Sequence, residues 1–134
     1  MSTPAAAPTA PPALLTGIGQ IAVRATDLAR AKAFYRDRLG LQFLFEAPNL
    51  LFFQCGSVWL MLGPAETEEV DHAASPLYFD VVDIHAAHRT LKDRGVPFRD
   101  EPHLIHRMGD RELWMTFFDD SEGNLFAIRS WKQT

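Results

Sequence analysis

The sequence of 134 residues has little of several features that would point to a function class. Its single cysteine, Cys55, excludes an internal disulfide and a zinc site built on several cysteines. One free thiol suits a reducing compartment, so we expect a cytoplasmic protein. The net charge of −4 comes without a basic stripe, so we expect no nucleic-acid partner. No apolar run approaches the ~18 residues that a membrane span needs, so we expect no membrane partner either.

The motifs of several large enzyme classes are also missing. The chain has no Gly-rich phosphate loop, no G-x-S-x-G elbow and no Walker lysine. Its hydrophobic content of 47% and charged content of 22% are ordinary for a globular protein. The opening stretch is nearly all Ala, Pro, Ser and Thr, a composition that buries too little to offset the entropy of ordering. We therefore expect a disordered tail over residues 1–16 and a single domain over 17–134.

The main positive signal is an internal repeat. Ile18–Arg38 combines an alternating apolar run with a helical pattern, and Leu77–Gly95 repeats this construction about 56 positions later. Asp27 in the first copy and Asp83 in the second occupy equivalent positions, where a short carboxylate can cap a helix. A self-match at a fixed offset indicates two copies of one supersecondary unit.

Each copy predicts the order β-α-β-β-β, and the second copy has one more short strand pattern, Val96–Arg99, directly after its helix. We assign the modules to residues 17–63 and 76–131, joined by an acidic linker over 64–75 that contains Pro64. The predicted fold class is α+β, with two βαβββ modules that pair to enclose a cavity. The expected strands are Ile18–Ala25, Leu41–Glu46, Leu50–Gln54, Val58–Leu62, Leu77–Val82, Val96–Arg99, Leu104–Met108, Glu112–Phe118 and Leu125–Ser130.

Two runs carry a family resemblance. Asp27–Leu41 reads DLARAKAFYRDRLGL and Phe117–Ile128 reads FFDDSEGNLFAI. They are similar to the helix-one signature and the closing hairpin of the vicinal oxygen chelate superfamily, which includes glyoxalase I, bleomycin-resistance proteins and extradiol dioxygenases. The resemblance covers Gly17–Trp131, and it implies a homodimer. It does not select one function, because this fold carries lyases, isomerases, dioxygenases and drug-binding proteins.

The same resemblance implies where a divalent metal would bind. Enzymes of the family take ligands from the first and last strand of each copy, and these positions fall on Gln20, Met61, Pro76 and Ala127. Only Gln20 offers the nitrogen or oxygen donor that such an ion prefers, and Met61 offers a thioether. We therefore expect no metal and no other cofactor, with one divalent metal as the alternative.

Without metal ligands the cavity becomes mostly apolar, as small-molecule pockets are. Gln20 is the expected polar anchor, although its amide could equally bond to nearby backbone. Strand alternation places further side chains inside with the former ligand positions. The expected ligand-binding residues are Gln20, Trp59, Met61, Tyr78, His103, Trp114, Leu125 and Ala127.

His103 is the candidate catalytic residue. Beside a carboxylate such as Glu101 it could act as a general base near neutral pH, although a surface histidine is the simpler interpretation. We expect His72, His85 and His88 to be solvated. Cys55 lies at a hairpin turn with no activating base nearby in sequence, so we do not expect a nucleophile there.

The leading hypothesis is a metal-free protein that binds a small apolar or aromatic molecule in the cup between the modules. Drug sequestration and binding of a metabolite are both compatible with it. The alternative is a glyoxalase-like lyase or isomerase, using a non-standard metal site or His103 as general base. A third possibility is a dimerisation module whose cavity is filled by its own aromatic side chains.

Overall fold

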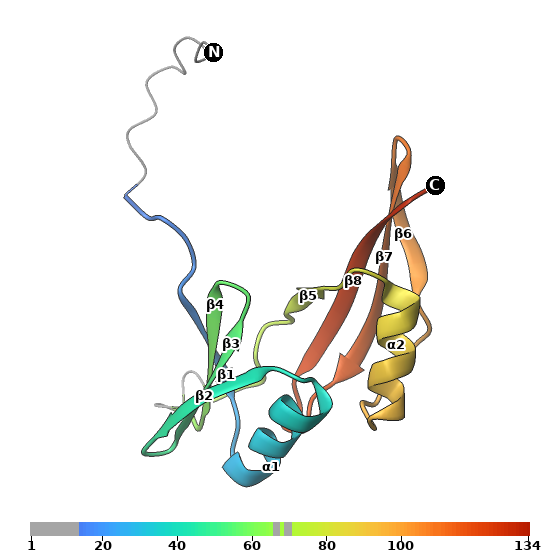
Figure 1. Cartoon of the computed structure of the whole chain (residues 1–134). Helices are drawn as coiled ribbons and strands as arrows, with labels where there is room; N and C mark the ends of the chain where they lie inside the picture. Colours follow the sequence, from blue (N-terminus) through green and yellow to red (C-terminus); the bar gives the residue numbers. More distant parts are fainter. Residues whose placement is uncertain (1–13, 66–67, 69–70) are drawn as a thin grey trace.

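Two four-stranded sheets make up the computed structural model, which describes residues 14–65, 68 and 71–134. Most of the expected N-terminal tail lies outside the described residues. The first sheet has the strand order β1-β4-β3-β2 and the second has the order β5-β8-β7-β6, so the two modules share one topology (Figure 1). The α+β class and the repeated βαβββ construction are confirmed. The division into 17–63 and 76–131 stays a prediction.

The first module begins with β1 (Gln20–Arg24), followed by α1 (Leu28–Ala33). The Asp27 carboxylate accepts a hydrogen bond from the Arg30 amide at 3.0 Å, which caps the first turn. The helix continues as the π-helical turn η1 (Phe34–Arg38). Gly40 then adopts a φ of 77°, the left-handed conformation that ends a helix most readily at glycine.

Three antiparallel strands complete the first sheet: β2 (Gln42–Ala47), β3 (Leu50–Cys55) and β4 (Val58–Gly63). Strand β1 pairs with β4 in parallel. The last residue of β4 must be glycine, because a Cβ at Gly63 would lie 2.6 Å from the carbonyl oxygen of Asn49.

The second module repeats the pattern with β5 (Tyr78–Asp80) and α2 (Ile84–Asp93). The Asp83 carboxylate caps α2, accepting from the amides of His85 and Ala86, each at 3.1 Å. The remaining strands are β6 (His103–Met108), β7 (Arg111–Asp119) and β8 (Leu125–Gln133). The predicted strand Val96–Arg99 was wrong, since this stretch forms only an isolated bridge between Phe98 and Phe118.

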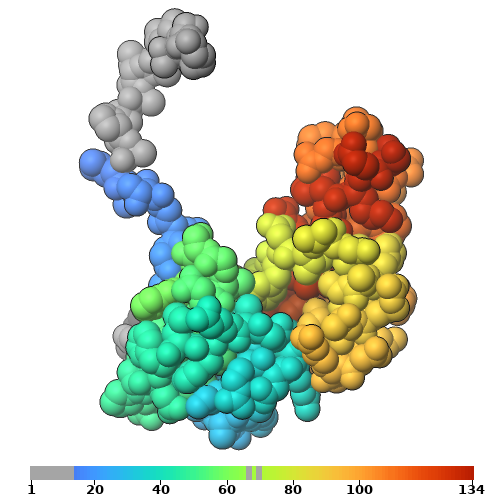
Figure 2. Space-filling view, in the orientation of Figure 1, coloured from blue at the N-terminus to red at the C-terminus, as the bar shows by residue number. Residues whose placement is uncertain are grey.

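The core lies between the sheets and their helices and runs through both modules. Its largest buried side chains include Tyr35 and Phe53 from the first module and Phe118 and Phe126 from the second. Figure 2 shows the two modules as two lobes with a hollow between them. Because α1 and α2 cover one face of each sheet, the opposite face of each sheet is left uncovered by helices (Figure 1).

No helix within the described residues is long and apolar enough to cross a membrane.

Candidate ligand-binding site

The uncovered face of the first sheet brings together three of the predicted site residues. Gln20 is paired with Trp59, and Ala22 is paired with Met61 in the parallel β1–β4 ladder. Because side chains alternate along a strand, these four share the face opposite the buried Leu60. The Gln20 amide Nε2 donates to the Met61 Sδ at 3.5 Å, so the predicted anchor touches the thioether at the next position along this face.

Aromatic rings cover the centre of this face. Phe45 stacks on Phe52 with centroids 4.4 Å apart, and Trp59 meets both rings edge-on at 5.7 and 5.8 Å. Phe45 is 42% exposed and Trp59 is 37% exposed. We call Phe45, Phe52 and Trp59 the aromatic platform. It offers flat apolar area and ring faces to a molecule that lies on it.

Polar contacts fix the orientation of the platform's indole. Trp59 Nε1 donates to Gln54 Oε1 at 2.9 Å, and Gln54 Nε2 donates to the carbonyl oxygen of Gly56 at 2.7 Å. Since both ends of the Gln54 amide are engaged, the indole is held in one position. Gln20 and Gln54 are therefore the two amide groups that flank the platform.

A cavity of about 420 Å³ is lined by Met61, the strand partner of the platform residue Phe52. Its walls combine β1 and β4 with residues that precede β5, including His72 and Ser75. Arg24 lies at its edge, with its guanidinium paired to the carboxylate of Asp71. The size falls within the range of small-molecule pockets, roughly 300–1,000 Å³.

The uncovered face of the second sheet carries a second set of predicted residues. Tyr78 is paired with Ala127, which is also paired with Phe117, and the rings of Tyr78 and Phe117 lie 6.0 Å apart. Leu125, two residues before Ala127 on β8, shares this face. Within the described part of the chain, no hydrogen bond or ring contact connects this set with Gln20, Trp59 or Met61. The predicted site residues therefore lie on two separate sheet faces.

His103 lies on the same side of the second sheet, since its partner Met115 is two residues from Phe117. Its Nδ1–H donates to the backbone carbonyl of Glu101 at 2.9 Å, which leaves Nε2 to exchange a proton. The neighbouring carboxylate is that of Asp100, with an oxygen 3.9 Å from Nδ1. The Glu101 carboxylate, the example expected from the sequence, lies instead 3.9 Å from Lys92 and 4.0 Å from His88.

Asp100 is held in its charged form. Burial alone would raise its pKa, but hydrogen bonds from the Thr116 hydroxyl at 2.7 Å and the Phe117 amide at 2.9 Å outweigh this effect. The pKa of Asp100 therefore lies below its usual value, and the carboxylate stays available beside His103 near neutral pH.

Two predicted placements differ from the structure. Trp114 lies on the helix-covered face, where its ring packs 5.3 Å from that of His85, and its Nε1 donates to Glu112 at 3.0 Å. It therefore does not join the other predicted ligand-binding residues. His88, expected to be solvated, is only 5% exposed and packs against Phe98 at 4.5 Å. His88 therefore lies on the buried face of α2, where its ring packs as an apolar side chain would.

Two residues that the sequence interpretation did not single out, Phe45 and Phe52, complete the uncovered face of the first sheet. Phe52 is paired with Met61 through the β3–β4 hairpin, and the turn at Gly56 fixes that register by pairing Cys55 with Val58. Counting back from this turn would have placed Phe52 beside Met61. No comparable signal existed for Phe45, because a bulge shifts the β2–β3 register between Phe43 and Phe45.

The four positions where the fold family carries metal ligands do not fit a divalent ion. Gln20 supplies one amide oxygen, Met61 a thioether, and Pro76 and Ala127 have no side-chain donor. The Gln20 amide also contacts the Met61 sulfur. Among the described residues, no three His, Cys, Asp or Glu side chains are grouped so that they could hold a metal.

Two βαβββ modules with the same strand order define the fold class of this chain. The family model described as the Glyoxalase/Bleomycin resistance protein/Dioxygenase superfamily matches residues 17–128. The chain belongs to this superfamily.

Individual relatives are distant. "Uncharacterized protein YetH" of Bacillus subtilis (strain 168) is 26% identical over 130 residues, which covers 87% of this chain and 99% of that protein. "Metallothiol transferase FosB" of Staphylococcus haemolyticus (strain JCSC1435) is 27% identical over 73 residues, about half (52%) of each chain. The solved structure of a lactoylglutathione lyase from Agrobacterium tumefaciens superposes with a TM-score of 0.63 at 22% identity, covering 88% of this chain and 96% of that one. At this identity the superposition shows the fold alone.

Proposed function

We propose that this protein is a metal-free binder of a small apolar or aromatic molecule, which rests on the uncovered face of the first sheet. The observation that supports this most strongly is the aromatic platform beside Gln20 and Met61. A group of rings in which Phe45 and Trp59 are exposed and Phe52 is buried, beside the expected metal-ligand position Met61, favours a flat ligand over a coordinated ion. Gln20 would orient the ligand through its amide, because the side-chain hydrogen bond that it makes within the described residues is a weak one to sulfur.

We further propose that the protein acts as a cytoplasmic homodimer in which the second sheet of the partner subunit covers the platform. Each chain exposes half-sites on two separate sheet faces, with Trp59 on one and Tyr78 on the other. If two copies of the chain pair about a two-fold axis, the first sheet of each copy faces the second sheet of the other. Both sets of residues are then buried in each of the two contacts. Sedimentation equilibrium tests this directly, and a monomer at micromolar concentration would contradict it.

Binding can be tested with proflavine, a planar aromatic cation that matches the ring faces and the net charge of −4. Titration followed by proflavine fluorescence should saturate at one dye per chain. The matched pair of variants is Trp59→Ala and Trp114→Ala, which remove the same side chain from opposite faces of the sheets. Loss of binding in the Trp59 variant alone supports the proposed site. Equal affinity in both variants contradicts it.

A second candidate is an enzyme in which His103 acts as general base on a carbonyl or epoxide substrate. It is favoured by one observation: Nδ1 is anchored to the Glu101 carbonyl, so Nε2 carries the free lone pair. Turnover of methylglyoxal or styrene oxide, lost in His103→Ala and kept in His106→Ala, supports this reading. If no turnover is found and His103→Ala binds proflavine as tightly as the wild type, the enzyme candidate is excluded and only the binding function remains.

A further inference from the structure

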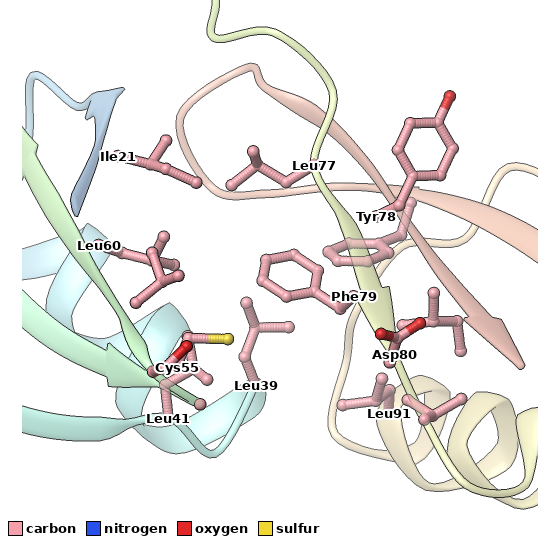
Figure 3. Close-up of a pocket in the computed structure, with 16 residues that line it drawn as sticks. Ile21, Leu39, Leu41, Cys55, Leu60, Leu77, Tyr78, Phe79, Asp80 and Leu91 are labelled. Atoms are coloured by element: carbon pink, nitrogen blue, oxygen red, sulfur yellow. The ribbon is translucent and has the colours of Figure 1, made fainter. Parts of the chain in front are cut away.

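A second hollow of about 560 Å³ lies between the modules on the helix-covered side. One wall includes Ile21 and Leu60, which face α1, and the other includes Phe79 and Leu91 of the second module. Figure 3 shows these side chains pointing toward one another across the space, while the Tyr78 ring points away from it. We call this hollow the intermodule cleft. None of the platform residues lines it.

The walls of the cleft are mostly aliphatic. Leu39 and Leu41 contribute from the end of η1 and the start of β2, and Leu77 and Val81 flank β5 on the other side. All four are only partly buried, so both walls keep apolar surface accessible to an occupant.

The side chains that line the cleft offer no unpaired charge to an occupant. The Asp80 carboxylate is exposed and forms an ion pair with Arg129, whose Nε donates to it at 2.7 Å. Cys55 contributes a thiol, and burial raises the pKa of this thiol, so it stays protonated near neutral pH. Ser57 contributes a hydroxyl. An occupant is therefore favoured when it is itself uncharged, since an ion would leave water without gaining a partner.

We propose that the intermodule cleft binds a neutral aliphatic molecule, with its chain between the leucine walls and one small polar end near Ser57 and Asp80. This site is independent of the platform and of the function proposed for it. A bound chain would touch both modules at once and thereby stabilise their relative arrangement.

Cys55 makes the proposal testable in the intact protein, because it is the only cysteine of the chain and lines the cleft. The probe is 1-decanol, and the readout is the rate at which methyl methanethiosulfonate, a small neutral reagent, modifies the thiol. Saturating decanol should slow modification by about tenfold or more, because an occupant excludes the reagent. Proflavine at saturation should leave the rate unchanged.

Two adjacent valines supply the matched variants. Val81 lines the cleft, whereas Val82 is 98% exposed and does not. Val81→Arg should abolish protection by decanol, and Val82→Arg should retain it. Should Val81→Arg fail to fold, Leu41→Arg introduces the same charge from the opposite module.

Three results would overturn the proposal. Decanol could fail to slow modification of Cys55, or both valine variants could lose protection by decanol equally. The third is that, without decanol, modification of Cys55 slows as the protein concentration rises. The last would mean that a second copy of the chain covers the cleft.

Discussion

The hydroxyl of Tyr35 donates a 2.5 Å hydrogen bond to the carboxylate of Asp120, across 85 residues of sequence. Tyr35 is fully buried in the first module, and Asp120 lies in the turn before β8 of the second. Burial, together with the charge and hydrogen bond of Asp120, raises the pKa of Tyr35, so the phenol remains a donor at any ordinary pH. Asp120 also accepts from the amides of Glu122 and Asn124 within its own turn, so the Tyr35 hydroxyl is bonded to a carboxylate that this turn holds in place.

Removing this hydroxyl should weaken the link between the modules. We expect Tyr35→Phe to lower the free energy of unfolding by roughly 1–3 kcal/mol, because a buried carboxylate loses one of its donors. Urea denaturation followed by circular dichroism measures the change. Tyr78→Phe is the control, since the Tyr78 side chain is largely exposed, and it should change stability by less than about 0.5 kcal/mol. Equal stabilities of wild type and Tyr35→Phe would contradict the role given to the bond.

Acid should weaken the same junction through Glu122. Its side chain is fully buried (0% exposed) and pairs with Arg30 at 2.7 Å. Burial alone would raise the pKa of Glu122, but hydrogen bonds from Arg30, Ser121 and two backbone amides outweigh it and lower the pKa below the ordinary value of 4.5. A depressed pKa in the folded state stabilises the fold above pH 4.5, and this contribution is lost as the pH falls from there through the folded pKa.

The check is the free energy of unfolding of wild type and Glu122→Gln between pH ~7 and ~3. The variant should be less stable at neutral pH, and the difference between the two proteins should shrink as the pH falls. Both proteins contain the other carboxylates with lowered pKa values, such as Asp83. Subtracting one free energy of unfolding from the other therefore removes their contributions. A difference that is constant with pH would exclude titration of Glu122 as the cause.

Gly63 should not tolerate a side chain. An added Cβ would lie 2.6 Å from Asn49 O and 2.7 Å from Leu50 Cδ2, so β4 must move away from the β2–β3 turn. We expect Gly63→Ala to cost about 1–3 kcal/mol of stability. At Gly19 a Cβ would meet nothing within 4 Å, so Gly19→Ala should be near neutral. Thermal unfolding of both variants distinguishes a steric cause from a general effect of removing glycine.

The aromatic platform should dominate proflavine affinity. Trp59→Ala should weaken binding by roughly tenfold or more, about 1.4 kcal/mol, through lost ring contact. Trp114→Ala should lower stability instead, because its ring packs against His85 of α2. Fluorescence titration and urea denaturation of both variants separate the two effects, and a larger affinity loss in the Trp114 variant would place the ligand elsewhere.

The repeat, the helix caps at Asp27 and Asp83, and most strands could be predicted from sequence, because apolar periodicity and capping are local properties. The side of the sheet on which Trp114 lies could not. The orientation of the Trp114 side chain is set by the pairing of Trp114 with Leu104, next to a bulge that shifts the register between Leu104 and His106. No local sequence motif marks that bulge. The burial of His88 depends on Phe98, ten positions away and outside any regular strand, so it too follows from tertiary packing.

The most direct test of the central claim is a proflavine titration of the same preparation before and after exhaustive dialysis against EDTA. If Gln20, Met61 and the platform bind a ligand without metal, the dissociation constant and the stoichiometry of one dye per chain should be unchanged. Binding that disappears with EDTA and returns with one equivalent of nickel, zinc, manganese or iron would contradict the account.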